Sequence, residues 1–189
     1  MPPPRILLIS GSTAPTSPAS RLAAAFAREL VFLDAEVTEV TLADYPLPLH
    51  DIDLPDMAVA GYVQKLRGLV KSHGAVFLAA PAVDGAMPAL VRNLIEWLQR
   101  PGGRPPIAPL FGLAAAAQDD VSAAAGLADL ERIVARCLGA TLIGGGLAVG
   151  RAELAFDAQG RLDDPRLAAA LQALARELVH AARRLAPEL

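Results

Sequence analysis

The sequence predicts a single α/β domain built as a doubly wound, three-layer sandwich, in which a parallel sheet of five strands carries helices on both faces. Five strand candidates alternate with five helical segments, the pattern of right-handed βαβ units. The strands around Ile6 and Val76 are apolar throughout, as in strands covered on both faces. A chain of 189 residues without an internal repeat or linker suits one such domain and is short for two. We therefore expect residues 1–189 to form one domain.

The first half of the chain supplies three strands. Ser17 can cap the helix that follows the opening apolar run, with Pro18 in its first turn, where a missing N–H costs nothing. The next strand is half polar, so we expect it near a sheet edge. The following helix stops at Gly74, a left-handed terminator. The predicted elements are strand 5–9, helix 20–33, strand 36–42, loop 45–55, a helix marked by apolar residues from Met57 to Val70, and strand 75–79.

The second half supplies two more strands and the remaining helices. Apolar residues at helical spacing mark these helices, and Gly139 ends one of them. Asp164 and Pro165 begin the last helix. The predicted elements are loop 81–87, helix 88–98, turn 101–106, strand 110–115, a polar stretch at 118–122, a helix marked from Leu127 to Leu138, a glycine-interrupted strand at 141–149, and a final helix reaching Leu185.

Composition narrows the class of protein. Hydrophobic residues make up 53% of the chain, and no segment has the apolar length of a membrane span. The start, Met-Pro-Pro-Pro-Arg, is unlike a secretory or transit signal, so we expect a soluble, cytoplasmic protein without a membrane partner. The net charge is −3 and no Lys/Arg run is present, which argues against nucleic acid as a partner.

Cysteine and histidine offer no site of their own. The single cysteine, Cys137, lies in an apolar helical stripe and is expected to be a buried structural thiol. The histidines, His50, His73 and His180, fall on separate segments, so no metal site is expected. His73, at a helix C-terminus, is more simply a partner of the helix dipole.

Residues 10–20 form an anion-binding candidate. A buried strand runs into a loop of small hydroxyl residues and then into a helix start, where backbone N–H groups and the helix dipole converge. The loop has one glycine and no Gly-Lys-Ser/Thr, so it matches neither the dinucleotide-binding nor the Walker A pattern. It can cradle one phosphate, and the alternative is an ordinary capped turn between strand and helix.

A second loop, residues 81–87, is expected beside the first. In the flavodoxin-like strand order 2-1-3-4-5, ligands bind beyond the carboxyl ends of the strands, between the first and third strands. Those ends are followed by residues 10–20 and 81–87. The fold argument alone therefore joins two loops that lie about seventy residues apart.

The second loop and the helix after it carry unusual residues at fixed spacing, namely Pro81, Gly85, Pro88, Asn93, Ile95 and Trp97. This stretch resembles the NADPH-dependent FMN reductase family of flavodoxin-like proteins, whose pattern is Pro-Glu-Tyr-Asn-Gly and then Pro-Gly-x-Leu-Lys-Asn-x-Ile-Asp-Trp. Gly11, Ser12 and Ser17 match the family's Gly-Ser-x-Arg-x-x-Ser-x-Asn, and residues 156–164 match its closing Phe-Asp-x-x-Gly-x-Leu-x-Asp. The resemblance spans nearly the whole chain.

The chain departs from the family pattern at several residues that are expected to contact the cofactor. The phosphate-loop arginine and asparagine are Ala14 and Ala19 here, so a phosphate would rest on neutral donors. The family's glutamate is Ala82, and its ring-stacking aromatic is Val83. The glycine- and serine-rich third loop of the family reads Ala-Ala-Ala-Ala-Gln-Asp-Asp at 114–120, which adds bulk where glycine lets a flavin approach.

The resemblance implies FMN as cofactor and NAD(P)H as electron donor. The phosphate would lie on the first loop and the ring against the second and third loops. Hydride transfer is the flavin's own chemistry, so no catalytic acid, base or nucleophile is required of the protein. The predicted cofactor-binding residues are Ser10, Ser12, Thr16, Ser17, Ser20, Pro81, Ala82, Val83, Asp84, Gly85, Met87, Ala116 and Gln118.

Several of these residues also have a purely structural interpretation. The serines can cap the helix and shape the turn, and Asp84 can be a plain turn residue. Asn93 and Trp97, four apart on one helical face, are expected to brace the loop and core rather than touch a ligand.

Two functions follow. The first is an NAD(P)H-dependent FMN or quinone reductase that passes hydride through the flavin to a flavin, quinone or similar small acceptor. The alternative is a flavodoxin-like binding or scaffold protein that has lost flavin or holds it without turnover. Ala14, Ala19, Val83 and the alanine-rich third loop favour the alternative, and the retained second-loop motif favours the enzyme. We also expect a homodimer or homotetramer, because helix 88–98 is apolar around much of its circumference.

Overall fold

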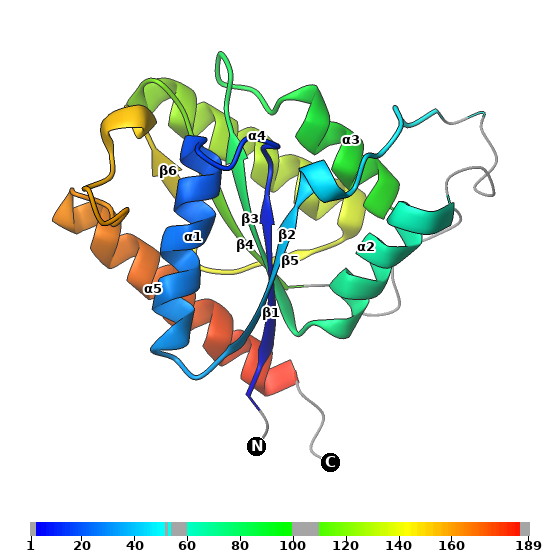
Figure 1. The fold of residues 1–189 in the computed structure, drawn as a ribbon, viewed down its shortest axis with the longest axis horizontal. Coiled ribbons are helices and arrows are strands. Elements are labelled where there is room, and N and C mark those ends of the chain that lie inside the picture. Colours follow the sequence, from blue (N-terminus) through cyan, green and yellow to red (C-terminus); the bar gives the residue numbers. More distant parts are fainter. Residues whose placement is uncertain (1–2, 52, 54–59, 100–109, 186–189) are drawn as a thin grey trace.

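The computed structural model describes residues 3–51, 53, 60–99 and 110–185 (Figure 1). The predictions at Met57 and at the turn 101–106 lie outside the described residues. Within the described part of the chain, no helix is long and apolar enough to cross a membrane.

The sheet is parallel and has the strand order β2-β1-β3-β4-β5, which confirms the predicted fold class and order. The half-polar second strand lies at the sheet edge, as its sequence predicts, whereas the third and fourth strands are buried along almost their whole length. The strands are β2 (Glu36–Thr41), β1 (Arg5–Ser10), β3 (Ala75–Pro81), β4 (Leu110–Ala116) and β5 (Thr141–Leu142).

Two short strands fill the fifth position of the sheet, where the sequence predicts one. β5 pairs with the start of β4, and β6 (Leu147–Val149) pairs with its end. Between them Gly144, Gly145 and Gly146 have φ angles of 75°, 67° and 71°. A left-handed run of this kind cannot continue an extended strand, so the glycine interruption predicted within 141–149 divides the strand into two segments.

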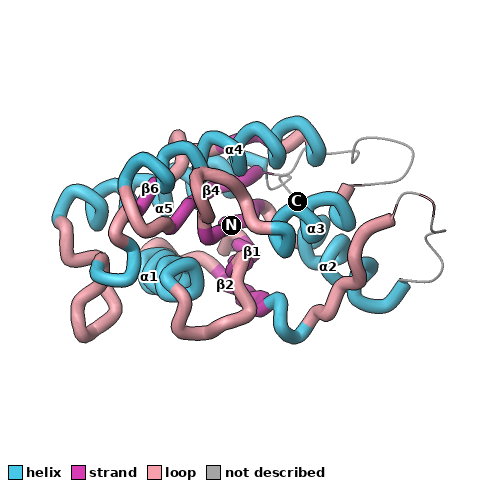
Figure 2. Tube along the Cα trace, turned by 90° about the horizontal axis from the view of Figure 1, so that it is seen from above, coloured by secondary structure: helices cyan, strands magenta, loops and turns pink. Residues whose placement is uncertain are grey.

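Helices cover both faces of the sheet (Figures 1 and 2). α1 (Pro18–Val31) and α5 (Pro165–Leu185) pack on one face. α2 (Ala60–Ser72), α3 (Ala89–Leu98) and α4 (Asp120–Leu138) pack on the other. Successive residues of β1 serve the two cores in turn, because side chains alternate across a strand. The two apolar layers explain why the strands are apolar without alternation.

Two helices begin earlier than apolar periodicity predicts. α1 begins at Pro18, directly after its cap Ser17. α4 begins at Asp120, and the Ser122 N–H donates to the capping side chain of Asp119 at 2.8 Å. The added turns of α4 are rich in alanine and contain Gly126, so they carry no amphipathic signal.

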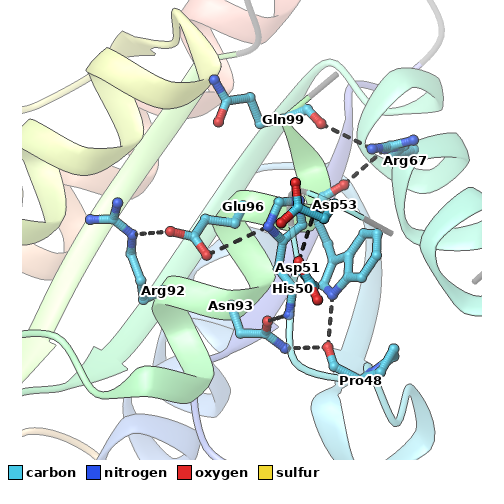
Figure 3. A network of polar contacts seen from close by, with 10 residues as sticks. Pro48, His50, Asp51, Asp53, Arg67, Arg92, Asn93, Glu96 and Gln99 are labelled. Carbon is cyan, nitrogen blue, oxygen red and sulfur yellow. Dashed lines mark hydrogen bonds and ion pairs between the residues drawn. The ribbon is translucent and has the colours of Figure 1, made fainter. Parts of the chain in front are cut away.

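The loop after β2 is fastened to α3 (Figure 3). The Pro48 carbonyl oxygen accepts hydrogen bonds from Asn93 Nδ2 at 2.9 Å and from Trp97 Nε1 at 2.8 Å. The His50 N–H donates to Asn93 Oδ1 at 2.7 Å. Asn93 and Trp97 are therefore bracing residues, as predicted. Tyr45 and Leu47 pack on the same core, so part of the apolar surface of α3 is covered within the chain.

His73 meets the end of α2 through hydrogen bonds. Its Nδ1 lies 2.6 Å from the Leu69 carbonyl oxygen and its Nε2 lies 2.8 Å from Thr38 Oγ1. Burial lowers the pKa of His73, whereas the hydrogen bond with the Leu69 carbonyl oxygen acts in the opposite direction. The ring lies at the carbonyl end of α2, where the sequence places it as a partner of the helix dipole.

Candidate functional site

The first loop ends in a capped helix at the carboxyl edge of the sheet. Ser17 Oγ accepts the Ser20 N–H at 3.2 Å, and Pro18 occupies the start of α1. This confirms the cap that the sequence predicts. The first turn of α1 therefore presents its N–H groups and its positive dipole end to the space above the sheet.

Three serine hydroxyls of this loop bind one another. Ser20 Oγ donates to the Ala14 carbonyl oxygen at 2.8 Å and accepts from Ser17 Oγ at 3.0 Å. Ser10 Oγ lies 2.8 Å from Ser20 Oγ, and since the Ser20 proton is committed to Ala14, Ser10 is the donor in that pair. The protons of Ser10, Ser17 and Ser20 are thus all used within the loop, and they fix its shape.

Other donors of the first loop remain available to a ligand. Ser12 Oγ accepts the Ala14 N–H at 3.2 Å and keeps its own proton, and Thr16 is exposed. The N–H groups of Thr13, Thr16 and Ala19 donate to no acceptor among the described residues. Amides gathered at a helix N-terminus suit an anion, so the loop fits a phosphate group through neutral donors.

The second loop is a two-residue hairpin. Val83 and Ala86 exchange N–H···O bonds of 3.0 Å in both directions. Asp84 and Gly85 form the turn with φ angles of 51° and 75°, the double positive φ that Asp-Gly adopts readily in tight hairpins. Val83 is 60% exposed, and Pro81 is the last residue of β3. The hairpin therefore offers an apolar side chain and the Asp84 and Gly85 N–H groups above the sheet.

Helix α4 packs against the strand end that leads into this hairpin. Ala82 is buried in a small cluster with Ala117 and Ala123, and a Cβ added at Gly126 would lie 2.2 Å from the Ala82 Cβ. The Ala82 side chain therefore faces α4, and the chain has no space there for the glutamate of the family pattern. Only the Ala82 backbone can reach a ligand.

Asp129 of α4 holds the end of the second loop, and the sequence analysis did not identify it. Its Oδ2 accepts the Met87 N–H at 3.1 Å, and it pairs with Arg132. Burial pushes the pKa of Asp129 up, but the hydrogen bonds from Met87 and Arg132 outweigh it and hold the pKa below its usual range. A lone aspartate on an amphipathic helix gives no sequence signal for this role.

The first loop starts directly beside β3, the strand that leads into the second loop. The Gly11 N–H donates to the Ala79 carbonyl oxygen at 2.7 Å. A Cβ at Gly11 would lie 2.7 Å from Val91 Cγ2 and 3.1 Å from the Ala80 Cα, so only glycine permits this approach. The predicted juxtaposition of the two loops at the switch point is confirmed.

The third loop borders the same edge of the sheet. Ala116 is buried and pairs with Pro81, whereas Gln118 is exposed. The Ala82 N–H donates to the Ala116 carbonyl oxygen at 2.8 Å. The structure thus brings the predicted residues of all three loops to one edge, with Ala82 and Ala116 turned inward.

Comparison with known proteins agrees with this fold. A search of curated proteins gave no match. Among solved structures, FerB, a flavoenzyme NAD(P)H:(acceptor) oxidoreductase from Paracoccus denitrificans, has a TM-score of 0.71 at 20% identity over 96% of this chain and 98% of that chain. An azoreductase from Bacillus anthracis str. Sterne has a TM-score of 0.62 at 15% identity over 96% and 100%. The apo form of NADH:FMN oxidoreductase (EMOB) has a TM-score of 0.69 at 15% identity over 98% and 91%.

At these identities the structural likeness establishes the fold alone. The sequence comparison goes further, because the family model described as NADPH-dependent FMN reductase matches residues 4–153. That match covers most of the chain and confirms the resemblance carried by the first two loops. The chain belongs to the NADPH-dependent FMN reductase family and is a flavin-dependent oxidoreductase.

Proposed function

We propose that this protein is an NAD(P)H-dependent FMN or quinone reductase, which passes hydride through FMN to a flavin, a quinone or a similar small acceptor. The observation that carries the proposal is the pairing of β1 with β3, continued by the Gly11–Ala79 hydrogen bond of 2.7 Å, because the two loops follow these neighbouring strands. It sets a helix start rich in free amides beside an exposed Asp84-Gly85 hairpin, at the edge where this fold places ligands.

The phosphate of FMN would bind at the start of α1. The N–H groups of Thr13, Thr16 and Ala19 and the hydroxyls of Ser12 and Thr16 supply the donors. Ser10, Ser17 and Ser20 act on the phosphate indirectly, since their protons hold the loop in shape.

The isoalloxazine ring would lie against the second and third loops. Val83 and Met87 would cover apolar surface of the ring, and the Asp84 and Gly85 N–H groups would serve its polar edge. Pro81, Ala82 and Ala116 would contribute backbone groups, and Gln118, beyond the end of β4, a side chain. When bound, FMN would supply the hydride chemistry, and these residues would bind and orient it.

A homodimer or homotetramer and a cytoplasmic location remain predictions. Exposed apolar side chains at the carboxyl end of the sheet, Val83, Val121 and Leu154, are where a second copy would border the site.

The test is a titration followed by reduction. Purified protein is titrated with FMN and with riboflavin, and the complex is then mixed anaerobically with NADPH or NADH while flavin absorbance is recorded. We expect FMN to bind more tightly than riboflavin and the flavin to bleach on addition of the donor. Tight FMN binding without bleaching would mean a holding protein, and absence of FMN binding would overturn the proposal.

A further inference from the structure

Arg151 adopts a backbone conformation that disfavours its own side chain. Its φ and ψ are 46° and 39°, in the left-handed region, which non-glycine residues occupy at a cost. The turn is fixed on both sides. A Cβ at Gly150 would lie 2.1 Å from Asp120 Oδ1, and the Ala152 N–H donates to the Ala117 carbonyl oxygen at 2.9 Å. A glycine at 151 would fit the turn without strain, yet arginine stands there.

The turn that carries Arg151 lies between the third loop and the start of α1. On one side, the Ala117 N–H donates to the Val149 carbonyl oxygen at 3.0 Å, which ties the turn to the end of β4. On the other side, Arg21 Nη1 lies 3.4 Å from the Glu153 carbonyl oxygen, and the Arg21 guanidinium lies 4.5 Å from the centre of the Phe156 ring. Figures 1 and 2 show this segment after β6 beside α1, at the same end of the sheet as the first loop.

Arg151 and Arg21 bring positive side chains to this corner, and the first loop has none. Residues 10–20 contain no charged side chain, and Ala14 stands where the family pattern has arginine. Arg151 is exposed and forms no ion pair or side-chain hydrogen bond within the described residues. The carboxylates of Asp119, Asp120 and Glu153 belong to the same corner, and none of them pairs with it at 4.0 Å or less.

We propose that Arg151 is a specificity-determining cation that binds a phosphate monoester at this edge of the site, with Arg21 adding positive charge from α1. A guanidinium matches phosphate oxygens in a bidentate manner. The ligand class is shared by two sources, the 5′-phosphate of FMN and the 2′-phosphate of NADPH. The inference rests on the proposed function, because it names the group that this site recognises in its flavin or its donor.

The decisive variant is Arg151→Gly, since it removes the charge and relieves the strained backbone together. We expect thermal stability to stay unchanged or rise. The preference for the phosphorylated ligand should fall about tenfold, which corresponds to the free energy of one hydrogen bond to a charged group. Arg151→Lys keeps a charge without the bidentate fork and should fall in between. Arg184→Ala, an exposed arginine near the end of α5, is the matched control and should match the wild type.

Two ligand pairs separate the two sources. Loss of the FMN preference over riboflavin assigns Arg151 to the flavin phosphate, and loss of the NADPH preference over NADH in kcat/KM assigns it to the donor. Both effects should shrink as salt rises. A variant with lowered stability and both preferences intact would overturn the assignment of Arg151 while leaving the proposed function in place. A wild type that binds neither FMN nor NADPH would overturn both.

Discussion

The first and second loops meet at one edge of the sheet but are held in shape by different means. The partners that shape the first loop lie within the loop itself, since Ser20 binds Ala14, Ser17 and Ser10. The second loop closes its own hairpin, but its support comes from α4, whose Asp129 lies 42 positions from Met87. Local chemistry thus shapes one half of the site, and tertiary packing positions the other half.

This contrast separates two kinds of mutational effect. Substitutions in the first loop should disturb its conformation and its phosphate donors. Substitutions on α4 should displace the second loop without touching a ligand. The predictions below run from the largest expected effect to the smallest.

Gly126→Ala should have the largest effect. The new Cβ would lie 2.2 Å from the Ala82 Cβ, and crowding of this kind costs about 1–3 kcal/mol of stability. The second loop should shift, and FMN and riboflavin affinity should fall together. Urea unfolding and fluorescence titration measure the two effects. Gly68→Ala in α2 is the control, because nothing lies within 4 Å of its added Cβ, and it should stabilise the helix by about 0.5–1 kcal/mol. Equal behaviour of the two variants would contradict the tight Ala82–Gly126 contact.

Ser20→Ala should follow, with a stability loss of about 1–2 kcal/mol, since the change leaves the Ala14 carbonyl and the Ser10 and Ser17 hydroxyls without their shared partner. The matched variant is Thr16→Ala. It should leave stability unchanged and weaken FMN but not riboflavin. If Ser20→Ala unfolds at the same urea concentration as the wild type, the serine network does not hold the loop.

Asp129→Ala should cost about 1 kcal/mol, because the Met87 N–H loses its acceptor. Asp129→Asn keeps an acceptor oxygen and should recover most of the loss. The folded-state pKa of Asp129 is lowered from 3.8, so its contribution is present above that value and is lost as pH falls through the lower folded-state pKa. Stability curves of wild type and Asp129→Asn should therefore converge in strong acid, and a constant gap down to the lowest pH would rule this out.

Val83→Tyr should have the smallest effect on the fold, and it should tighten flavin binding by about 0.5–1.5 kcal/mol through offset stacking or edge contact with the ring. Val83 is 60% exposed, so the larger side chain finds room and the fold should not change. Fluorescence titration with FMN checks the affinity, and circular dichroism checks the fold. An unchanged or weaker affinity with an intact fold would show that the ring does not lie against this residue.

The exposed and local features of the site were predictable from sequence. Ser17 and Pro18 mark a helix start in any context, and Asp84 is recognisable as a turn residue, although the hairpin that it forms with Gly85 was not predicted. The contributions of α4 were not predictable, because Gly126 and Asp129 have a role only when the second loop packs on them. The early start of α4 could not be predicted from apolar periodicity, because its first turns are rich in alanine, which has no strong preference for either side of a helix.

The sequence by itself determined the alternation of strands and helices, the cap of α1 and the motif that assigns the family, because apolar patterning and turn chemistry act over a few neighbouring residues. The strand order was predicted by analogy with the flavodoxin-like fold. The tertiary structure alone decided which serine protons remain for a ligand, which way Ala82 faces and where Arg151 lies. It also showed that the two halves of the glycine-interrupted fifth strand pair with opposite ends of β4. Such outcomes depend on distances between segments far apart in the chain, and these distances are fixed only when the layers pack.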